Sequence, residues 1–180
     1  MRSKCIYVLK ILVLWFCLIS DLQGSISAKP YNKSTSVASA SRELYKRFLR
    51  TQSLPFEDCG SQYDILYLDI SCCSEIPCQM KRGTKPTVYV IFDDEGSNTT
   101  LLKHQVRWVF NAIRTEASIT PDPCDGNLEC LKNNNDGKSY WATINVNNTL
   151  PTISGSMIWE AADANNNNVI CFKVPVVVIN

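Results

Sequence analysis

The chain has 180 residues and a formal net charge of +1. Residues 1–50 hold nine Lys or Arg against two Asp or Glu, whereas residues 51–180 hold nine against fifteen, so a basic leader precedes an acidic domain. The acidic part is a poor candidate for binding nucleic acid, whose phosphates attract clusters of Lys and Arg, and its length of about 130 residues suits one domain.

The first residues, MRSKCIYVLKILVLWFCLIS, combine a short basic start with an apolar run that only Lys10 interrupts. This layout is typical of a secretory signal peptide. A membrane anchor would need about 20 uninterrupted apolar residues, and residues 11–19 are too few. We therefore predict a signal peptide over residues 1–24, cut between residues 20 and 28, and a secreted, extracellular or lysosomal protein.

Residues 25–50 form the basic leader that remains after cleavage. The stretch KPYNKSTSVASAS at 29–41 has little to bury, and we expect it to be disordered. In RELYKRFLR, Leu44 and Phe48 lie four residues apart, as in a turn or two of helix, but nine residues make a marginal helix alone. The RFLR motif at 47–50 also fits a basic processing site, so residues 25–50 are either a disordered arm or a propeptide.

Seven of the nine cysteines lie between Cys59 and Cys171, after the predicted signal peptide. In an oxidising compartment disulfides are the default and thiolate metal sites the exception. Zinc usually requires two paired cysteine motifs or added histidines, and the one histidine, His104, lies far from any cysteine cluster. We expect no metal and no cofactor. Spacing alone leaves the pairing open, because six cysteines allow fifteen arrangements.

From Phe56 onward, apolar and polar residues alternate with period two, which predicts half-buried β-strands. Turn sequences rich in Gly, Pro, Asn and Asp separate these segments, and NNNN at 165–168 predicts a long hairpin tip. Six or seven antiparallel strands in about 120 residues predict a β-sandwich of immunoglobulin-like type. Cys59 precedes the first strand, so no cysteine pair is expected across the space between the sheets.

Several stretches together resemble the ML lipid-recognition domain family, and within it the Niemann-Pick type C two sterol carriers and their arthropod relatives. The resemblance covers residues 54–180, within a predicted domain at 51–180. It is carried by FEDCGS at 56–61, CSEIPC at 73–78, PDPCDGNLEC at 121–130, KSYWATINV at 138–146, LPTISGSMIWE at 150–160 and CFKVPVVV at 171–178.

The resemblance implies a disulfide pairing. It joins Cys59 with Cys171, Cys73 with Cys78, and Cys124 with Cys130. Cys72 is then the odd cysteine. We expect it to be buried and inert as a small hydrophobe, with pairing between chains or competition with Cys73 as the alternatives.

The resemblance also implies that the two sheets stand apart around an apolar pocket for a sterol or similar lipid. Val146 and Leu150 align with positions at the mouth, and Ala117 or Ile119 replaces a phenylalanine there, which leaves more room for a fatty acid or another lipid. The expected lining is Leu66, Leu68, Ile70, Val88, Val90, Phe92, Val106, Trp108, Phe110, Ala117, Ile119, Val146, Leu150, Met157, Trp159, Val174 and Val176.

The implied function is a secreted, monomeric carrier that transfers a sterol or similar apolar lipid between membranes or to a membrane acceptor. The alternatives are a binder of microbial lipids such as lipopolysaccharide in innate immunity, a semiochemical carrier, and an adhesion sandwich without a pocket. Asn32, Asn98 and Asn147 begin N-x-S/T motifs, and each is a candidate for glycosylation.

Catalysis is not expected. An enzyme of this kind would need an activated nucleophile with its base, a metal, or a carboxylate pair in a cleft. Of the seven cysteines after the predicted signal peptide, all except Cys72 are assigned to disulfides by the resemblance. The carboxylates of DDE at 93–95 fall in a predicted turn, where solvated charge is the ordinary explanation.

Overall fold

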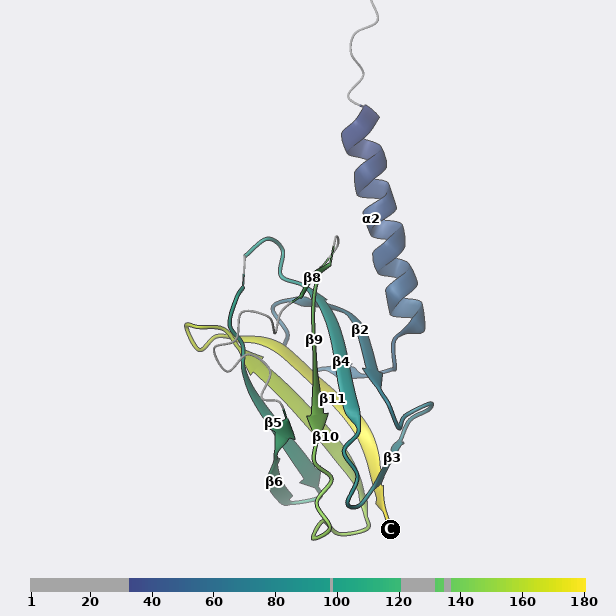
Figure 1. Cartoon of the computed structure of the whole chain (residues 1–180), viewed down its shortest axis with the longest axis vertical. Coiled ribbons are helices and arrows are strands. Elements are labelled where there is room, and N and C mark those ends of the chain that lie inside the picture. Colours follow the sequence, from purple (N-terminus) through teal and green to yellow (C-terminus); the bar gives the residue numbers. More distant parts are fainter. Residues whose placement is uncertain (1–32, 98, 121–131, 135–136) are drawn as a thin grey trace, which may run out of the picture. The chain divides into compact units, whose positions relative to one another are not determined.

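The computed structural model describes residues 33–97, 99–120, 132–134 and 137–180 (Figure 1). The chain divides into two compact units, residues 1–38 and 39–180. Of the first unit the structure describes only residues 33–38, the first part of a helix. The second unit holds the rest of this helix and every described strand.

Helix α2 spans Lys33–Gln52 and so includes residues 33–41, for which the sequence analysis expects disorder. No Gly or Pro occurs between its ends, and the Ser, Ala, Lys and Arg residues there are compatible with a helix. Its last turns gain contacts with the sandwich through Leu49, and such packing supplies most of the stability of helices in proteins. In the described part of the chain, no helix is long and apolar enough to cross a membrane.

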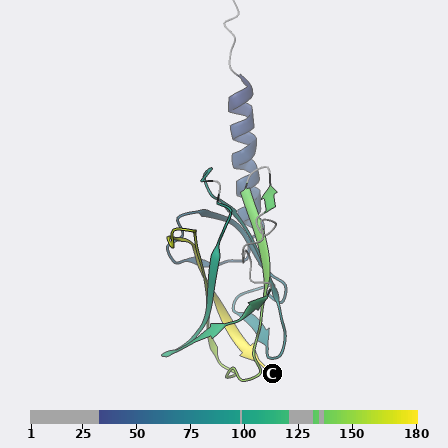
Figure 2. The same cartoon turned by 60° about the vertical axis from the view of Figure 1, so that its left-hand side comes forward.

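The described strands form two sheets that pack face to face (Figure 2). In one sheet the order is β1-β11-β10-β5-β6, with β3 also paired to β11; in the other it is β2-β4-β9-β7, with β8 paired to β9. The bounds are Glu57–Asp58 (β1), Asp64–Ile70 (β2), Cys78–Lys81 (β3), Thr87–Asp93 (β4), Lys103–Phe110 (β5), Ile113–Ala117 (β6), Ile119–Thr120 (β7), Lys132–Asn134 (β8), Gly137–Ile144 (β9), Ser154–Ala162 (β10) and Asn168–Ile179 (β11).

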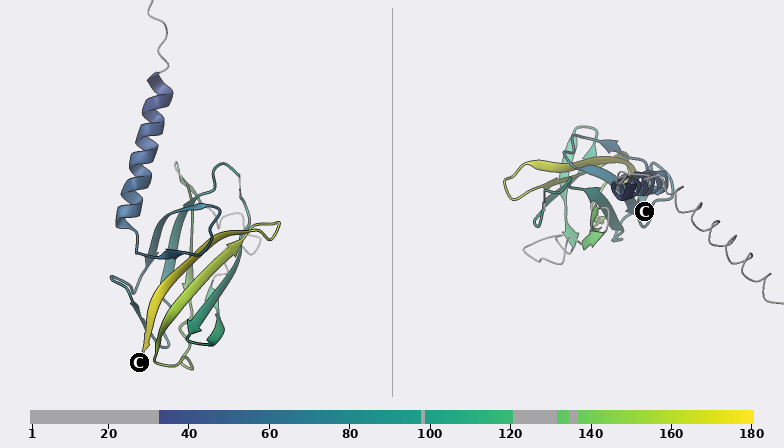
Figure 3. Two further views of the ribbon diagram at one scale, coloured as in Figure 1. Left: turned by 180° about the vertical axis from the view of Figure 1, so that it is seen from behind. Right: turned by 90° about the horizontal axis from the view of Figure 1, so that it is seen from above.

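The predicted β-sandwich of two antiparallel sheets is confirmed. One pairing differs, because β3 runs parallel to β11, with Cys78 opposite Val176. Strands β10 and β11 lie side by side along most of their length (Figure 3) and join at the predicted hairpin tip. Asp163 organises that tip, since its Oδ1 accepts hydrogen bonds from the backbone N–H groups of Asn165 and Asn167.

Two disulfides hold the edges of the sandwich. Cys59 and Cys171 join the chain after β1 to β11, with Cα atoms 5.0 Å apart. Cys73 and Cys78 join the chain after β2 to the start of β3 and so link an edge of one sheet to an edge of the other. Both pairings are those that the family resemblance implies. The third expected pair, Cys124 with Cys130, lies outside the described residues.

Cys72 is exposed, and the expectation of a buried thiol is wrong. The residue lies in the turn that directly follows β2, where the chain leaves the sheet. Its Sγ atom still lies 3.5 Å from the Sδ atom of Met80. Partial burial of the thiol raises its pKa.

Candidate functional site

The space between the sheets is filled by inward side chains from both layers. Of the seventeen residues predicted to line a pocket, fourteen belong to one buried cluster, and Ala117 and Ile119 are half-buried and pack against it. The fourteen are Leu68, Ile70, Val88, Val90, Phe92, Val106, Trp108, Phe110, Val146, Leu150, Met157, Trp159, Val174 and Val176.

Leu66 is the exception, and its predicted place in the pocket is wrong. Strand β2 contains a bulge: Ile65 pairs with Phe92 and Tyr67 pairs with Ile91, so that Leu66 has no partner of its own in β4. An extra residue of this kind reverses the alternation of faces. Ile65 therefore takes the inward position, and Leu66 packs with Leu49 and Ile91 in a separate cluster on the other face.

Sequence reasoning missed part of the inward layer. In β9 the side chains of Tyr140, Ala142 and Ile144 are buried between the sheets, on the same face as Val146. The period-two pattern of SYWATINV contains this information, since all four residues are two apart. Phe172 was missed in the same way, two residues before Val174 in β11.

The inward side chains are closely packed. Leu68, Met157, Trp159 and Val174 have no exposed surface. The ring of Trp159 in β10 stacks on that of Tyr140 in β9 of the facing sheet, with centroids 6.3 Å apart. The resemblance implies an open pocket at this position, but among the described residues the two walls meet in a dense apolar core.

Open volume lies at one end of this core. A groove of about 340 Å³ separates the β6–β7 segment from the loop between β9 and β10, and this volume is at the low end of the range for pockets that bind small ligands. Trp108, Ala117 and Leu150 form its apolar wall, while Thr115, Asn145 and Asn147 are among the polar lining residues.

The predicted mouth positions are only partly brought together at this groove. Ala117 and Leu150 line it, whereas Val146 is fully buried behind it and Ile119 is half-buried in β7. Asn147, a candidate for glycosylation, is exposed on the rim. Its Oδ1 atom accepts a hydrogen bond from the backbone N–H of Thr149.

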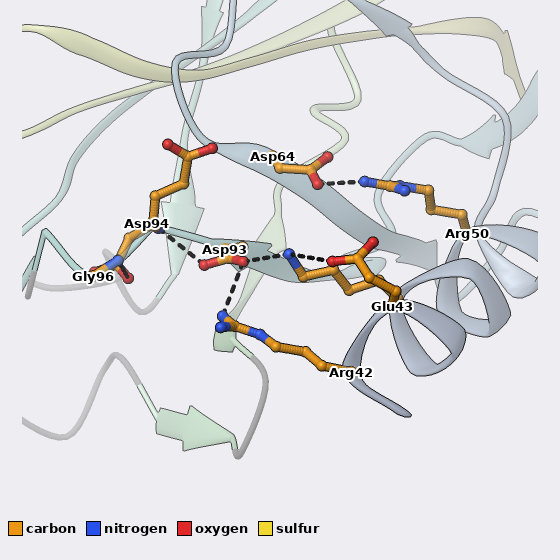
Figure 4. Close-up of polar contacts among 9 residues, drawn as sticks. Arg42, Glu43, Arg50, Asp64, Asp93, Asp94 and Gly96 are labelled. Atoms are coloured by element: carbon orange, nitrogen blue, oxygen red, sulfur yellow. Dashed lines mark hydrogen bonds and ion pairs between the residues drawn. The ribbon is translucent and has the colours of Figure 1, made fainter. Parts of the chain in front are cut away.

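Asp93 and Asp94 of the DDE segment are buried, in contrast to the expectation from the sequence, whereas Glu95 is exposed as expected. Asp93 is 4% exposed, and its carboxylate lies 2.7 Å from Nζ of Lys46 and 3.1 Å from the guanidinium of Arg42 (Figure 4). Asp94 is 8% exposed and lies 2.6 Å from Nζ of Lys138. A turn that carries buried carboxylates is stable because each one is paired with a cation.

The pKa values of both aspartates follow from these contacts. Burial opposes the ionisation of Asp93, but the hydrogen bond and the charge of Lys46 outweigh it, so the pKa is lowered. Burial of Asp94 is likewise outweighed by its bond to Lys138, and its pKa is also lowered. These groups are ionised at neutral pH and lie outside the apolar core, so their role is to hold helix and turn in place.

Comparisons with known proteins agree with this arrangement. Residues 53–178 match the family model described as ML domain. The mouse protein named NPC intracellular cholesterol transporter 2 is 29% identical over 131 residues, which cover 71% of this chain and 86% of that protein. The Drosophila melanogaster protein named NPC intracellular cholesterol transporter 2 homolog a is 26% identical over 128 residues, which cover 68% and 86% respectively.

Among solved structures, a Niemann-Pick type C2 protein from the Japanese carpenter ant superposes with a TM-score of 0.58 and 22% sequence identity. The match covers 70% of this chain and 100% of that structure, and it shows the same fold. Helix α2 ends at Gln52, immediately before residues 53–178, which match the family model. Because the family model covers most of the chain, we conclude that this protein belongs to the ML-domain family.

Proposed function

We propose that this protein is a carrier that binds a sterol or a similar apolar lipid between its two sheets and transfers it. The observation that carries the proposal is the groove of about 340 Å³, whose apolar wall of Trp108, Ala117 and Leu150 is continuous with the core between the sheets. The names of the mouse and Drosophila relatives, which are those of cholesterol transporters, support the same ligand class.

Binding requires the inward side chains to move apart. A sterol-sized molecule that buries roughly 400 Å² of apolar surface gains about 10 kcal/mol before costs, at about 25 cal/mol per Å². Loss of translational freedom and of core contacts offsets part of this gain. Most of the displaced contacts are apolar, for example those of Val90 and Val174, and the lipid replaces them with contacts of the same kind.

The two long edges of the sandwich are each closed by a covalent connection between the sheets. The Cys73–Cys78 disulfide joins the sheets at the β2 and β3 edge. At the opposite edge the chain passes from β6 in one sheet to β7 in the other through Ser118 alone. Since the groove lies at this second edge, we expect the lipid to enter there, beside Ala117.

Secretion, glycosylation and processing form part of the proposal. We expect a signal peptide at residues 1–24 and a monomer in the extracellular or lysosomal fluid. Asn147 is an exposed candidate glycan site, while Asn32 and Asn98 lie outside the described residues.

Processing at the RFLR motif is not expected to release helix α2. Within this motif, Leu49 is buried and Arg50 forms an ion pair with Asp64, so the helix should stay with the folded domain instead of leaving as a propeptide. Amino-terminal sequencing of secreted protein tests this, and a start at Thr51 contradicts it.

Binding of microbial lipids and transport of semiochemicals, the two alternative functions for a lipid-binding interior, are less well supported. The relatives are named for cholesterol transport, which favours a sterol over microbial lipids or semiochemicals. The protein is proposed to act without catalysis, by binding and release alone.

The proposal is tested by extracting lipid from natively purified, secreted protein and identifying it by mass spectrometry. A sterol or another lipid of similar size, recovered in near-stoichiometric amount, supports a carrier. Recovery of no lipid, together with no binding of cholesterol or of a fatty acid by the purified protein, contradicts it and favours an adhesion role.

A further inference from the structure

The groove lies between two walls that are held in different ways. One wall is formed by β6, which is hydrogen-bonded to β5 over five residue pairs. The other wall is the loop between β9 and β10, to which Asn147, Thr149 and Leu150 belong. The middle of this loop, residues 147–152, is part of no strand. Contacts from elsewhere in the chain must therefore hold it, and it is the wall that moves more easily.

The two ends of the loop are fixed by backbone hydrogen bonds. At its start, the N–H of Val146 donates to the carbonyl of Thr84 at 3.0 Å, and the carbonyl of Val146 accepts from the N–H of Gly83 at 2.7 Å. At its end, the carbonyl of Ile153 accepts from the N–H of Val178 at 3.1 Å. These bonds fix where the loop begins and ends and leave its middle to other contacts.

Arg82 supplies the hydrogen bonds that reach the middle of the loop. It directly follows β3, and its Nη1 atom donates to the carbonyl oxygens of Asn148 and Leu150, both at 3.4 Å. The N–H groups of Thr149 and Leu150 bond to Asn147, inside the loop. Among the residues that the structure describes, the Arg82 guanidinium is therefore the one hydrogen-bonding group outside the loop that holds its middle.

The Arg82 side chain is itself held in place. Its Nη2 atom donates to Oδ1 of Asn180, and its backbone N–H donates to the carbonyl of Ile179 at 3.0 Å. The next residue, Gly83, has a φ of +75°, and a Cβ atom there would lie 2.8 Å from Oδ1 of Asn148. The turn after β3 thus lies directly against the loop. Because a guanidinium carries five N–H donors in a fixed plane, one side chain can hold two loop carbonyls and Asn180 together.

We propose that Arg82 is a positioning residue that holds the loop wall of the groove in place and thereby sets the rate at which lipid enters and leaves. This inference rests on the proposed carrier function and adds to it the group that controls passage. Leu150 lines the groove, and its carbonyl is one of the two that Arg82 binds. The groove can widen on this side only when these hydrogen bonds break, and bonds from a charged donor are stronger than neutral ones.

The contact should act on rates and not on affinity. Arg82 neither lines the groove nor packs between the sheets, so its bonds to the loop are the same before and after lipid binds. Their removal changes the free energies of the empty and the loaded protein equally and leaves the dissociation constant unchanged. In the transition state for passage, with the loop moved aside, these bonds are already broken. Their removal therefore lowers the barrier to entry and to exit by the same amount.

The test measures exchange of a fluorescent sterol, dehydroergosterol, by stopped flow. Association is followed on mixing with lipid-free protein, and dissociation on displacement by excess cholesterol. In Arg82→Met we expect both rate constants to rise about tenfold or more, the effect of losing a hydrogen bond to a charged group, with a dissociation constant within about twofold of wild type. Arg82→Lys, which keeps a charged donor but not the planar fork, should show a smaller rise.

The matched control is Arg47→Met. Arg47 is exposed on helix α2, and within the described part of the chain it forms no ion pair or hydrogen bond. Its replacement removes a guanidinium of the same charge and size at a place remote in sequence from the loop. Both rate constants should stay at the wild-type values.

Unchanged rate constants in Arg82→Met overturn the proposal. Faster dissociation with unchanged association also overturns it, because Arg82 would then stabilise the loaded protein and not control passage. Hydrogen exchange of the wild-type protein needs no variant: the N–H of Leu150, 3.1 Å from the Asn147 carbonyl, should be protected about tenfold or more. Exchange at the unprotected rate would mean that the loop opens freely, which likewise contradicts the role of Arg82. Failure of wild-type protein to bind sterol contradicts the carrier function itself, so the two failures are distinguishable.

Discussion

The ammonium group of Lys46 lies 2.7 Å from the carboxylate of Asp93, and this contact joins helix α2 to the end of β4. Arg42 approaches the same carboxylate, and Leu49 packs on Leu66 and Ile91 below it. A segment that precedes the matched ML domain is thus fastened to one sheet by a buried carboxylate and a small apolar cluster.

Replacing Asp93 by Asn should loosen the helix. The substitution keeps the shape and a hydrogen-bond acceptor but leaves Lys46, whose side chain is only 14% exposed, without its counter-charge. We expect a loss of about 1.5–3 kcal/mol in the free energy of unfolding, measured in urea, as for hydrogen bonds to charged groups, together with faster amide exchange in residues 42–50.

The control for this variant is Asp64→Asn, which removes the ion pair with Arg50. Both of these side chains are more than a third exposed, and such surface pairs contribute about 1 kcal/mol or less. Equal losses for the two variants would contradict the assignment of Asp93 as the main attachment of the helix.

The attachment should also depend on pH in a defined window. Burial of Asp93 opposes its ionisation, but the contacts with Lys46 outweigh it, and the pKa lies below its ordinary value of 3.8. A group with a lowered folded-state pKa stabilises the protein above its unfolded pKa, and this contribution is lost as the pH falls through the folded pKa. The protection factors of the helix α2 amides, which correct for the intrinsic pH dependence of exchange, should therefore be similar at pH 7 and pH 5 and should fall only below about pH 4. Release of the helix between pH 7 and pH 5 would contradict this.

Because of the bulge at Leu66, the two buried leucines of strand β2 lie on opposite faces of the sheet. Leu66→Ala and Leu68→Ala should each lower the free energy of unfolding by about 2–5 kcal/mol, because both side chains are fully buried. Only Leu68 faces the space between the sheets. Cholesterol affinity should change in Leu68→Ala and remain at the wild-type level in Leu66→Ala. A similar change in both variants would mean that Leu66 contacts the ligand.

Period-two alternation located most of the inward layer, since a strand with one buried face places every second residue there. It failed at Leu66 because a bulge changes which residues of the strand face inward. The sequence DILYLDI contains no glycine or other residue that marks this bulge. It also reports which side chains face inward but not how far apart the walls stand. For this reason the packed contact of Trp159 with Tyr140 was beyond sequence reasoning.

Other misses came from contacts between segments distant in the sequence. The DDE segment resembles a solvated turn until Lys46 and Lys138, from a helix and another strand, are placed beside Asp93 and Asp94. The helix over residues 42–52 is likewise stabilised by distant contacts, namely those of Lys46 with Asp93 and of Leu49 with Leu66 and Ile91. The exposure of Cys72 likewise depends on the direction in which the chain leaves β2.

Cys72 should react with a thiol reagent in the native protein, since it is exposed. Partial burial of its sulfur raises the pKa above the ordinary value of 9.0, and the thiolate is the reactive form. Iodoacetamide should therefore modify Cys72 more slowly at pH 7.5 than it modifies glutathione, and the rate should rise steadily toward pH 10. Mass spectrometry of tryptic peptides measures this, with Cys72→Ser as the unreactive control. Resistance of Cys72 to modification at pH 10 in the folded protein would contradict its exposure.

The central claim is that lipid enters through the groove beside Ala117 and separates the two sheets. Ala117→Trp should fill this groove, whereas Ala112→Trp places the same side chain on the exposed turn between β5 and β6. The most direct measurement is equilibrium binding of cholesterol to the wild-type protein and these two variants. We predict saturable binding near one lipid per chain for wild type and Ala112→Trp, and a loss of tenfold or more in affinity for Ala117→Trp. Equal binding by all three proteins, or none by wild type, would contradict the account.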